Sequence, residues 1–258
     1  MPIRIDDELP AKQSLELENV FVMSNKRADT QDIRPLDIII LNLMPTKIET
    51  ETQLLRLLSN SPLQINIDLL QVASHKSKNT SQEHMLKFYK TFDKVCHNRY
   101  DGMIITGAPL ANFKFEDVDF WDELCKIFEW TKTNVYSTFH LCWGAFAGLY
   151  YHYGIEKQPL DAKMFGVFPH RVQNRKTPLV RGFDDVFYAP HSRYTGISRE
   201  DVEKAGVFTV LADSEEAGYF LLSAENGKRI FVLGHPEYDR VTLDKEYKRD
   251  IAKGLDEK

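Results

Sequence analysis

Residues 134–154 read NVYSTFHLCWGAFAGLYYHYG, and this stretch decides the fold. Its first nine residues, 134–142, form a largely apolar run of the kind that builds a buried strand. Small residues follow at once, including Gly144 and Gly148, and they allow the chain to turn sharply into a helix. A buried strand that runs directly into a helix is typical of an α/β sheet.

The same alternation of strands and helices extends toward the N-terminus. Apolar, partly β-branched runs at LDIIILNL (36–43), LQINIDLLQV (63–72) and DGMIITGAP (101–109) predict three more strands. Apolar residues at helical spacing predict helices over 46–60 and 119–130. Strands separated by helices in this way indicate an α/β fold with a mostly parallel sheet flanked by helices.

After about residue 160 the pattern changes to short apolar runs that lie close together in the sequence. These runs are MFGVFPHRV (164–172), VFYAP (186–190), VFTVLAD (207–213), GYFLLSA (218–224) and RIFVLGHPEYD (229–239). They predict an antiparallel extension of the sheet in the C-terminal half. A last amphipathic helix is predicted from apolar residues spaced by four, namely Leu243, Tyr247, Ile251 and Leu255.

The organisation into domains follows from the same reading. Residues 1–35 are polar and carry Pro2, Pro10 and Pro35, so they are expected to form an N-terminal arm. No internal repeat and no long linker interrupts the rest, which favours a single domain over 36–258.

Composition excludes several classes of protein. The chain has 258 residues, 43% of them hydrophobic and 28% charged, which are ordinary globular proportions. Its formal net charge of −5 argues against nucleic acid as a partner. No apolar run is long enough to cross a bilayer, and the first dozen residues lack the apolar core of a signal peptide. Three cysteines without close pairing indicate a reducing compartment, so we expect a cytoplasmic protein that binds no membrane.

Cys142 is the first candidate for chemistry. It ends the predicted strand at the turn into the helix, where the helix dipole and unpaired N–H groups stabilise a thiolate. The Trp143 amide is the first N–H available to stabilise an oxyanion. The alternative is an inert buried cysteine, as expected for Cys125 in mid-helix and for Cys96, which has no small-residue turn beside it.

His235 and Glu237 form the second candidate. They end an apolar strand as His-Pro-Glu, and residues i and i+2 of an extended segment point to the same side. Glu237 is therefore expected beside the His235 imidazole, fixing its tautomer and stabilising its charged form. Together with Cys142 they supply a nucleophile, a base and a group that orients the base.

Other patterns add little. The strand end at Gly107 and Pro109 is a third candidate, expected to place backbone N–H groups near the thiol, and the alternative is an ordinary connection from strand to helix. No HExxH or paired CxxC motif is present, so no metal site is predicted. The glycine-rich motifs of dinucleotide and P-loop sites are also absent.

A cysteine at a strand–helix turn, followed late in the chain by His-Pro-Glu, resembles the class I glutamine amidotransferases. Those enzymes normally carry Gln shortly after the cysteine, where this chain has Phe146. A fuller resemblance, from residue 1 to about 255, is to the MetA family of homoserine O-acyltransferases. It rests on ILNLMPTKIETETQLLRLL (40–58), DGMIITGAP, HLCWGAFAGLYYHYGI (140–155), APHSRY (189–194), GHPEYD (234–239) and EYKRDIAKGL (246–255).

The resemblance implies an amidotransferase-like fold and a role for each matching residue. Cys142 matches the nucleophile that takes an acyl group from acyl-CoA as a thioester, His235 the general base and Glu237 its partner. Lys163, Ser192 and Arg249 match positions that contact the substrate. Acyl-CoA is then a co-substrate, no resident cofactor is expected, and the chain is expected to form a homodimer.

The resemblance also marks positions that govern specificity. Ala111 stands where family members that use acetyl-CoA usually have Glu and those that use succinyl-CoA usually have Gly. Phe146 replaces a usual Gln, and Ser192 is a further candidate for acceptor specificity. Three other functions stay open: serine O-acetylation in cysteine synthesis, hydrolysis of glutamine for a partner, and a non-catalytic binding module, which the intact catalytic positions disfavour.

Overall fold

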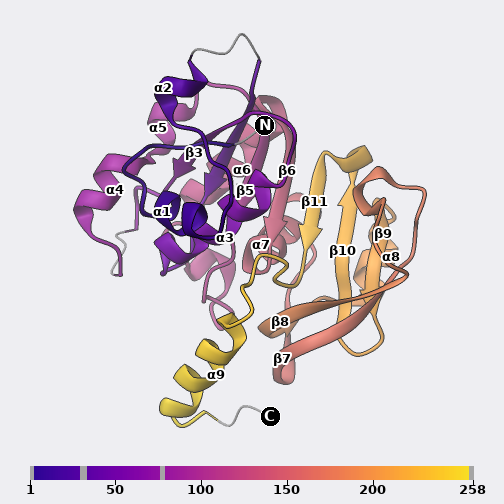
Figure 1. Cartoon of the computed structure of the whole chain (residues 1–258). Coiled ribbons are helices and arrows are strands. Elements are labelled where there is room, and N and C mark those ends of the chain that lie inside the picture. The colour runs from indigo at the N-terminus through magenta and orange to yellow at the C-terminus, as the bar shows by residue number, and fades with distance from the viewer. Residues whose placement is uncertain (1–2, 30–33, 76–78, 256–258) are drawn as a thin grey trace. The chain divides into compact units, whose positions relative to one another are not determined.

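A computed structural model describes residues 3–29, 34–75 and 79–255 (Figure 1). Its internal contacts divide the chain into two units. The first unit comprises Met1–Pro109 and Phe115–Thr138, and the second comprises Leu110–Lys114 and Phe139–Lys258. Strand β6 (Val135–Leu141) contributes to both, because the division falls after Thr138.

The first unit is built on a parallel sheet. Strand β2 (Leu36–Leu41) pairs in parallel with β3 (Ile65–Leu70) on one side and β5 (Tyr100–Ile105) on the other. The short strands β1 (Ile3–Arg4) and β4 (Tyr89–Lys90) also pair in parallel with β3. The C-terminal half of β2 is buried, as expected for a β-branched run inside a parallel sheet.

Helices connect these strands. They are α1 (Pro10–Leu17), α2 (Asn25–Ala28), α3 (Lys47–Ser59), α4 (Gln82–Phe88), α5 (Phe92–Val95), the 3₁₀ turn η1 (Phe115–Asp117) and α6 (Trp121–Asn134). Helices α3 and α6 confirm the two predicted from spacing. Leu124, Ile127 and Phe128 form the buried stripe of α6, because residues three and four apart share one face of a helix.

The second unit carries the antiparallel part of the fold. Its helices are α7 (Trp143–Tyr153), α8 (Arg199–Ala205) and α9 (Thr242–Ala252), with 3₁₀ turns η2 (Pro178–Val180) and η3 (Glu225–Gly227). Its sheet contains β7 (Gln158–Val172), β8 (Val186–Gly196), β9 (Phe208–Ser214), β10 (Gly218–Ala224) and β11 (Arg229–Val232). The strand order is β11-β10-β9-β7-β8, and every pairing along it is antiparallel.

The predicted fold class is therefore confirmed: parallel strands with helices in the N-terminal half and an antiparallel extension in the C-terminal half. Two strands are longer than predicted, since β7 has 15 residues and β8 has 11. Charged residues interrupt the apolar runs of both strands, Lys163 in β7 and Arg193 in β8. Such interruptions predict that a strand ends there, so the predicted strands are too short.

Helix α9 also differs from its prediction. It ends at Ala252, so Leu255 lies beyond it, and Tyr247 and Ile251 are exposed. The side chain that α9 buries near its C-terminus is the charged Asp250. Asp250 can be buried because its carboxylate pairs with the cationic side chain of Lys163.

Residues 3–4 of the predicted N-terminal arm form β1 and pair with β3, and α1 packs against α3. Residues 1–2, 30–33, 76–78 and 256–258 lie outside the described part of the chain. The division into an arm (1–35) and one domain (36–258) stays a prediction. In the described segments, no helix combines the length and the apolar character needed to span a membrane.

Candidate active site

Cys142 lies at the turn between β6 and α7, in a backbone conformation that side chains rarely adopt. Its φ is +45° and its ψ is −114°. Its N–H donates to the Val232 carbonyl at 2.8 Å, and its own carbonyl accepts from Ala145 N at 2.9 Å and Phe146 N at 3.1 Å. Such a conformation costs about 1–3 kcal/mol and persists only when surrounding contacts hold it. The predicted sharp turn at Cys142 is present.

Small residues in α7 allow this helix to pack closely against the sheet. A Cβ atom on Gly148 would lie 2.7 Å from His140 Cδ2 and 3.0 Å from Phe231 Cε1. The first distance is shorter than real Cβ contacts and the second is tighter than most of them, so only glycine fits without displacing a ring. The packing of α7 against β6 and β11 thereby fixes the start of the helix, where Cys142 and Trp143 lie.

His235 and Glu237 are in contact, as the sequence predicts. The imidazole Nδ1 lies 2.8 Å from Glu237 Oε1, and both residues are buried. A carboxylate only accepts, so Nδ1 carries a proton and Nε2 is left to exchange protons. The backbone N–H of His235 donates to the Pro190 carbonyl at 2.9 Å, which anchors the base on β8.

The His235 side chain is also hydrogen bonded to Cys142, which brings nucleophile and base together. Burial alone would lower the pKa of His235, but the negative charges of Cys142 and Glu237 outweigh it and raise that pKa well above its ordinary value. The imidazolium form is therefore stabilised beside the sulfur. Cys142, His235 and Glu237 together have the geometry of nucleophilic catalysis.

Arg193 is a charged group near Cys142 to which the sequence analysis assigns no role. It is buried on β8, and it donates to His191 Nδ1 at 3.3 Å, to the Ala217 carbonyl at 2.6 Å and to the Thr195 carbonyl. Within the described chain it forms no ion pair with a carboxylate. Burial lowers the pKa of Arg193 to about 10, and the charge of Cys142 acts in the opposite direction. Its position within APHSRY was the available signal.

Lys163 and Arg249 are brought together by a residue that the sequence analysis did not single out. Lys163 Nζ lies 2.6 Å from Asp250 Oδ2, and the Arg249 guanidinium contacts both oxygens of the same carboxylate at 2.7 and 2.9 Å. The Arg249 hydrogen bonds, and then Lys163, hold the pKa of Asp250 well below its usual range. Lys163 and Asp250 are buried, whereas Arg249 is half exposed.

The remaining predicted site residues lie on a strand, on a helix and in a loop of the second unit. Ser192 is half-buried on β8, opposite Phe165 of β7. Trp143 is buried as the first residue of α7, and Phe146 is buried one turn further along the helix. Ala111 lies in the loop 110–114, where its carbonyl accepts from Lys157 Nζ at 2.7 Å.

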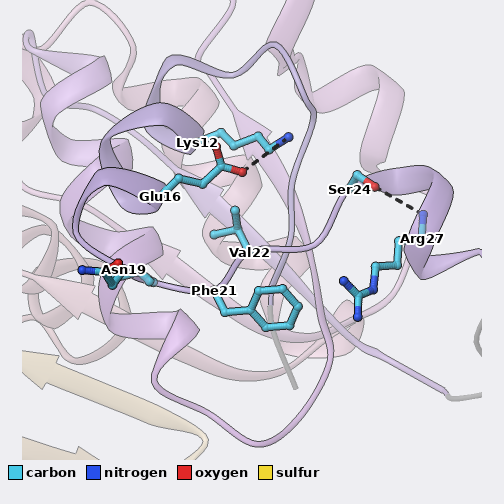
Figure 2. A pocket seen from close by; sticks show the side chains of 8 residues that line it. Lys12, Glu16, Asn19, Phe21, Val22, Ser24 and Arg27 are labelled. Atoms are coloured by element: carbon cyan, nitrogen blue, oxygen red, sulfur yellow. Dashed lines mark hydrogen bonds and ion pairs between the residues drawn. The ribbon is translucent and has the colours of Figure 1, made fainter.

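The residues predicted for catalysis, substrate binding and specificity all belong to the second unit, whereas the candidate strand end at Gly107 and Pro109 belongs to the first. A surface pocket of about 450 Å³ in the first unit contains none of them (Figure 2). It is lined by Lys12, Glu16, Asn19, Val20, Phe21, Val22, Ser24 and Arg27. No three His, Cys, Asp or Glu side chains in the described ranges cluster closely enough to hold a metal ion.

Comparison with known proteins supplies the family. Residues 2–258 match the family described as Homoserine O-succinyltransferase. The chain is 60% identical over 255 residues to a homoserine O-acetyltransferase of Acetivibrio thermocellus, covering 99% of this chain and 84% of the relative. It is 61% identical over 256 residues to a homoserine O-acetyltransferase of Lachnospira eligens, covering 99% and 83%.

A solved glutamine amidotransferase of Thermotoga maritima superposes with a TM-score of 0.59 at 12% identity, covering 87% of each chain. At that identity the likeness concerns the fold alone, and it confirms the amidotransferase-like fold that the sequence resemblance implies. The match over nearly the whole length, together with the close relatives, shows that this chain belongs to the homoserine O-succinyltransferase family.

Proposed function

We propose that this chain is a homoserine O-acyltransferase of methionine biosynthesis that carries the acyl group on Cys142 as a thioester. The observation that carries the proposal is the contact of Cys142, at its sharp turn, with His235, which Glu237 orients. The family match and relatives named homoserine O-acetyltransferase support the substrate.

The first half-reaction takes the acyl group from acyl-CoA. The Cys142 thiolate attacks the thioester carbonyl carbon, and the resulting oxyanion accepts from the Trp143 backbone N–H. Collapse breaks the bond to the CoA sulfur, which leaves with the proton of the His235 imidazolium. Acyl-Cys142 and neutral His235 remain.

The second half-reaction delivers the acyl group to the acceptor. His235 Nε2 removes the proton of the acceptor hydroxyl, whose oxygen attacks the acyl carbon. The bond to sulfur breaks, and the Cys142 thiolate and His235 imidazolium are restored. Arg249, Lys163 and Ser192 are proposed to bind the amino-acid acceptor, since a carboxylate needs a cation and an amine needs polar oxygens.

Acetyl-CoA is the proposed donor, because the relatives that match over nearly the whole chain are named for the acetyl group. A matrix of acetyl- and succinyl-CoA against homoserine and serine, with free CoA as the readout, tests both substrates. We expect the highest kcat/KM for acetyl-CoA with homoserine. Faster reaction with serine would move the chain to serine O-acetylation, and ammonia release from glutamine without CoA would overturn acyl transfer.

The thioester has its own test. Incubation with acetyl-CoA alone should add one acetyl mass to a peptide that contains Cys142. Cys142→Ala should abolish the adduct and turnover, while the matched variant Cys125→Ala should keep both. An adduct on Cys96 or Cys125 would refute the role of Cys142.

A further inference from the structure

The proposed base is covered by a second aromatic ring. The Tyr238 ring stacks on the His235 imidazole with centroids 4.1 Å apart and planes 21° apart. The hydrogen bonds to Glu237 and Cys142 both lie in the plane of the imidazole, so they leave the ring free to rock about the line that joins them. Stacking restricts that rocking, because tilting the imidazole would lose contact with the face of Tyr238.

Tyr238 is in turn held by helix α9. Its hydroxyl donates to Glu246 Oε1 at 2.9 Å. Burial, followed by the negative charge of Glu246, raises the pKa of Tyr238 far above its ordinary value. The phenol therefore stays protonated at neutral pH and remains a donor to Glu246.

Glu246 lies next to the proposed acceptor-binding groups. It is 3.9 Å from Arg249 Nη1, and Arg249 and Lys163 share the Asp250 carboxylate. The buried ion pair between Lys163 and Asp250 joins β7 to α9, and it thereby fixes the position of the helix that carries Glu246. A continuous series of contacts thus runs from the His235 imidazole to the groups proposed to hold the acceptor.

We propose that Tyr238 is a positioning residue that sets the plane of the His235 imidazole and ties it, through Glu246, to the helix that binds the acceptor. The inference rests on the proposed function and deepens it. The contacts from Tyr238 through Glu246 end at Arg249, which is proposed to bind the acceptor. They are therefore expected to matter in the second half-reaction, in which the acceptor hydroxyl must lie within reach of His235 Nε2. The first half-reaction needs the stack but not the hydroxyl.

The two half-reactions separate these roles. Tyr238→Phe keeps the ring and removes the hydroxyl, so CoA release in the absence of acceptor should stay at the wild-type rate. Transfer from acyl-Cys142 to homoserine should slow about 10- to 100-fold, the loss expected when a reacting group is displaced by about 1 Å. Tyr238→Leu also removes the stack, so it should slow both half-reactions.

Two controls accompany these variants. Glu246→Gln keeps an oxygen that accepts from Tyr238, so it should preserve most of the transfer rate that Tyr238→Phe loses. Tyr188→Phe removes an exposed hydroxyl on β8 and should change neither half-reaction. Wild-type transfer in Tyr238→Phe, or equal slowing of both half-reactions, would overturn the proposal.

The position of the Tyr238 ring over His235 can also be measured without acyl transfer. The ring current of Tyr238 shifts the His235 ring-proton NMR signals, so Tyr238→Leu should return them toward free-histidine values while Tyr238→Phe should not. Unchanged signals in Tyr238→Leu count against the stack. Failure of the wild-type chain to form acyl-Cys142 counts against the proposed function instead.

Discussion

At the scale of single residues, the charge of His235 depends on two anionic neighbours. Burial works against the imidazolium, and Cys142 and Glu237 more than compensate, so the pKa of His235 is raised. In the proposed mechanism the imidazolium supplies the proton that the departing CoA sulfur needs. Above that pKa the proton is lost, and the rate of the first half-reaction should fall as pH rises.

Glu237→Gln removes one of the two anions and should lower the pKa of His235. A lower pKa leaves less imidazolium at any pH above it, so the alkaline limb of CoA release should move to lower pH, by about 1 unit or more. Stopped-flow CoA release between pH 6 and 10 measures the limb. Glu203→Gln, an exposed carboxylate on α8, is the matched control. An unmoved limb in Glu237→Gln would show that the carboxylate does not set the charge of His235.

At the scale of elements, one lysine organises the loop that carries Ala111. Lys157 Nζ donates to the carbonyls of Ala111 at 2.7 Å, Phe113 at 2.6 Å and Leu110 at 3.3 Å. Burial lowers the pKa of Lys157, yet the three converging oxygens suit an ammonium donor. The loop therefore has a defined shape although it contains no helix or strand.

Lys157→Met should loosen this loop without unfolding the protein. Hydrogen bonds to a charged group contribute about 1.5–3 kcal/mol, so exchange of the Phe113 amide, which donates to Leu110, should be about 10- to 100-fold faster. The ratio of acetyl- to succinyl-CoA use should change while the KM for homoserine does not. Lys176→Met serves as the control, and equal exchange in both variants would show that Lys157 does not hold the loop.

Helix α9 supplies a prediction about stability. Asp250→Asn leaves Lys163 buried without its counter-ion and should cost about 3–5 kcal/mol at pH 7. Asp244→Asn on the same helix breaks only an exposed pair with Lys248 and should cost about 0.5 kcal/mol or less. Chemical denaturation of both variants and the wild type gives the two differences.

The pH dependence of that cost has a definite sign. The pKa of Asp250 is lower in the folded chain than in the unfolded chain, so its charge stabilises the fold above the unfolded value of about 4. This stabilisation shrinks as pH falls toward the folded pKa. The gap between wild type and Asp250→Asn should therefore narrow from pH 5 to pH 3, and a constant gap would argue against ionisation as its source.

At the scale of the whole molecule, the sequence predicts what depends on local periodicity. The run 134–142, the small residues after it and the i, i+2 relation of His235 and Glu237 are local patterns, and they led to the strand, the turn and the hydrogen bond that the structure contains. Composition added the class of protein, and motif resemblance added the family.

The contacts that the sequence analysis did not predict join segments that lie far apart in the chain. Asp250 meets Lys163 across 87 residues, and Lys157 meets Ala111 across 46. Periodicity shows which face of a helix is apolar but not which distant charge faces it. For this reason α9 was expected to bury Ile251, whereas it buries its neighbour Asp250.

The sharp turn at Cys142 has a consequence for how this protein responds to heat. Glycine normally destabilises a chain relative to alanine by about 0.5–1 kcal/mol, but at φ +45° the preference should reverse. Cys142→Gly should melt above Cys142→Ala by about 2–4 °C, measured by calorimetry. A lower melting temperature for the glycine variant would mean that the turn stores no strain. If the glycine variant melts higher, as expected, a heat screen that scores only folded protein favours glycine over alanine at a position where neither residue supplies a thiol. Thermal selection of this protein therefore needs activity as a second criterion.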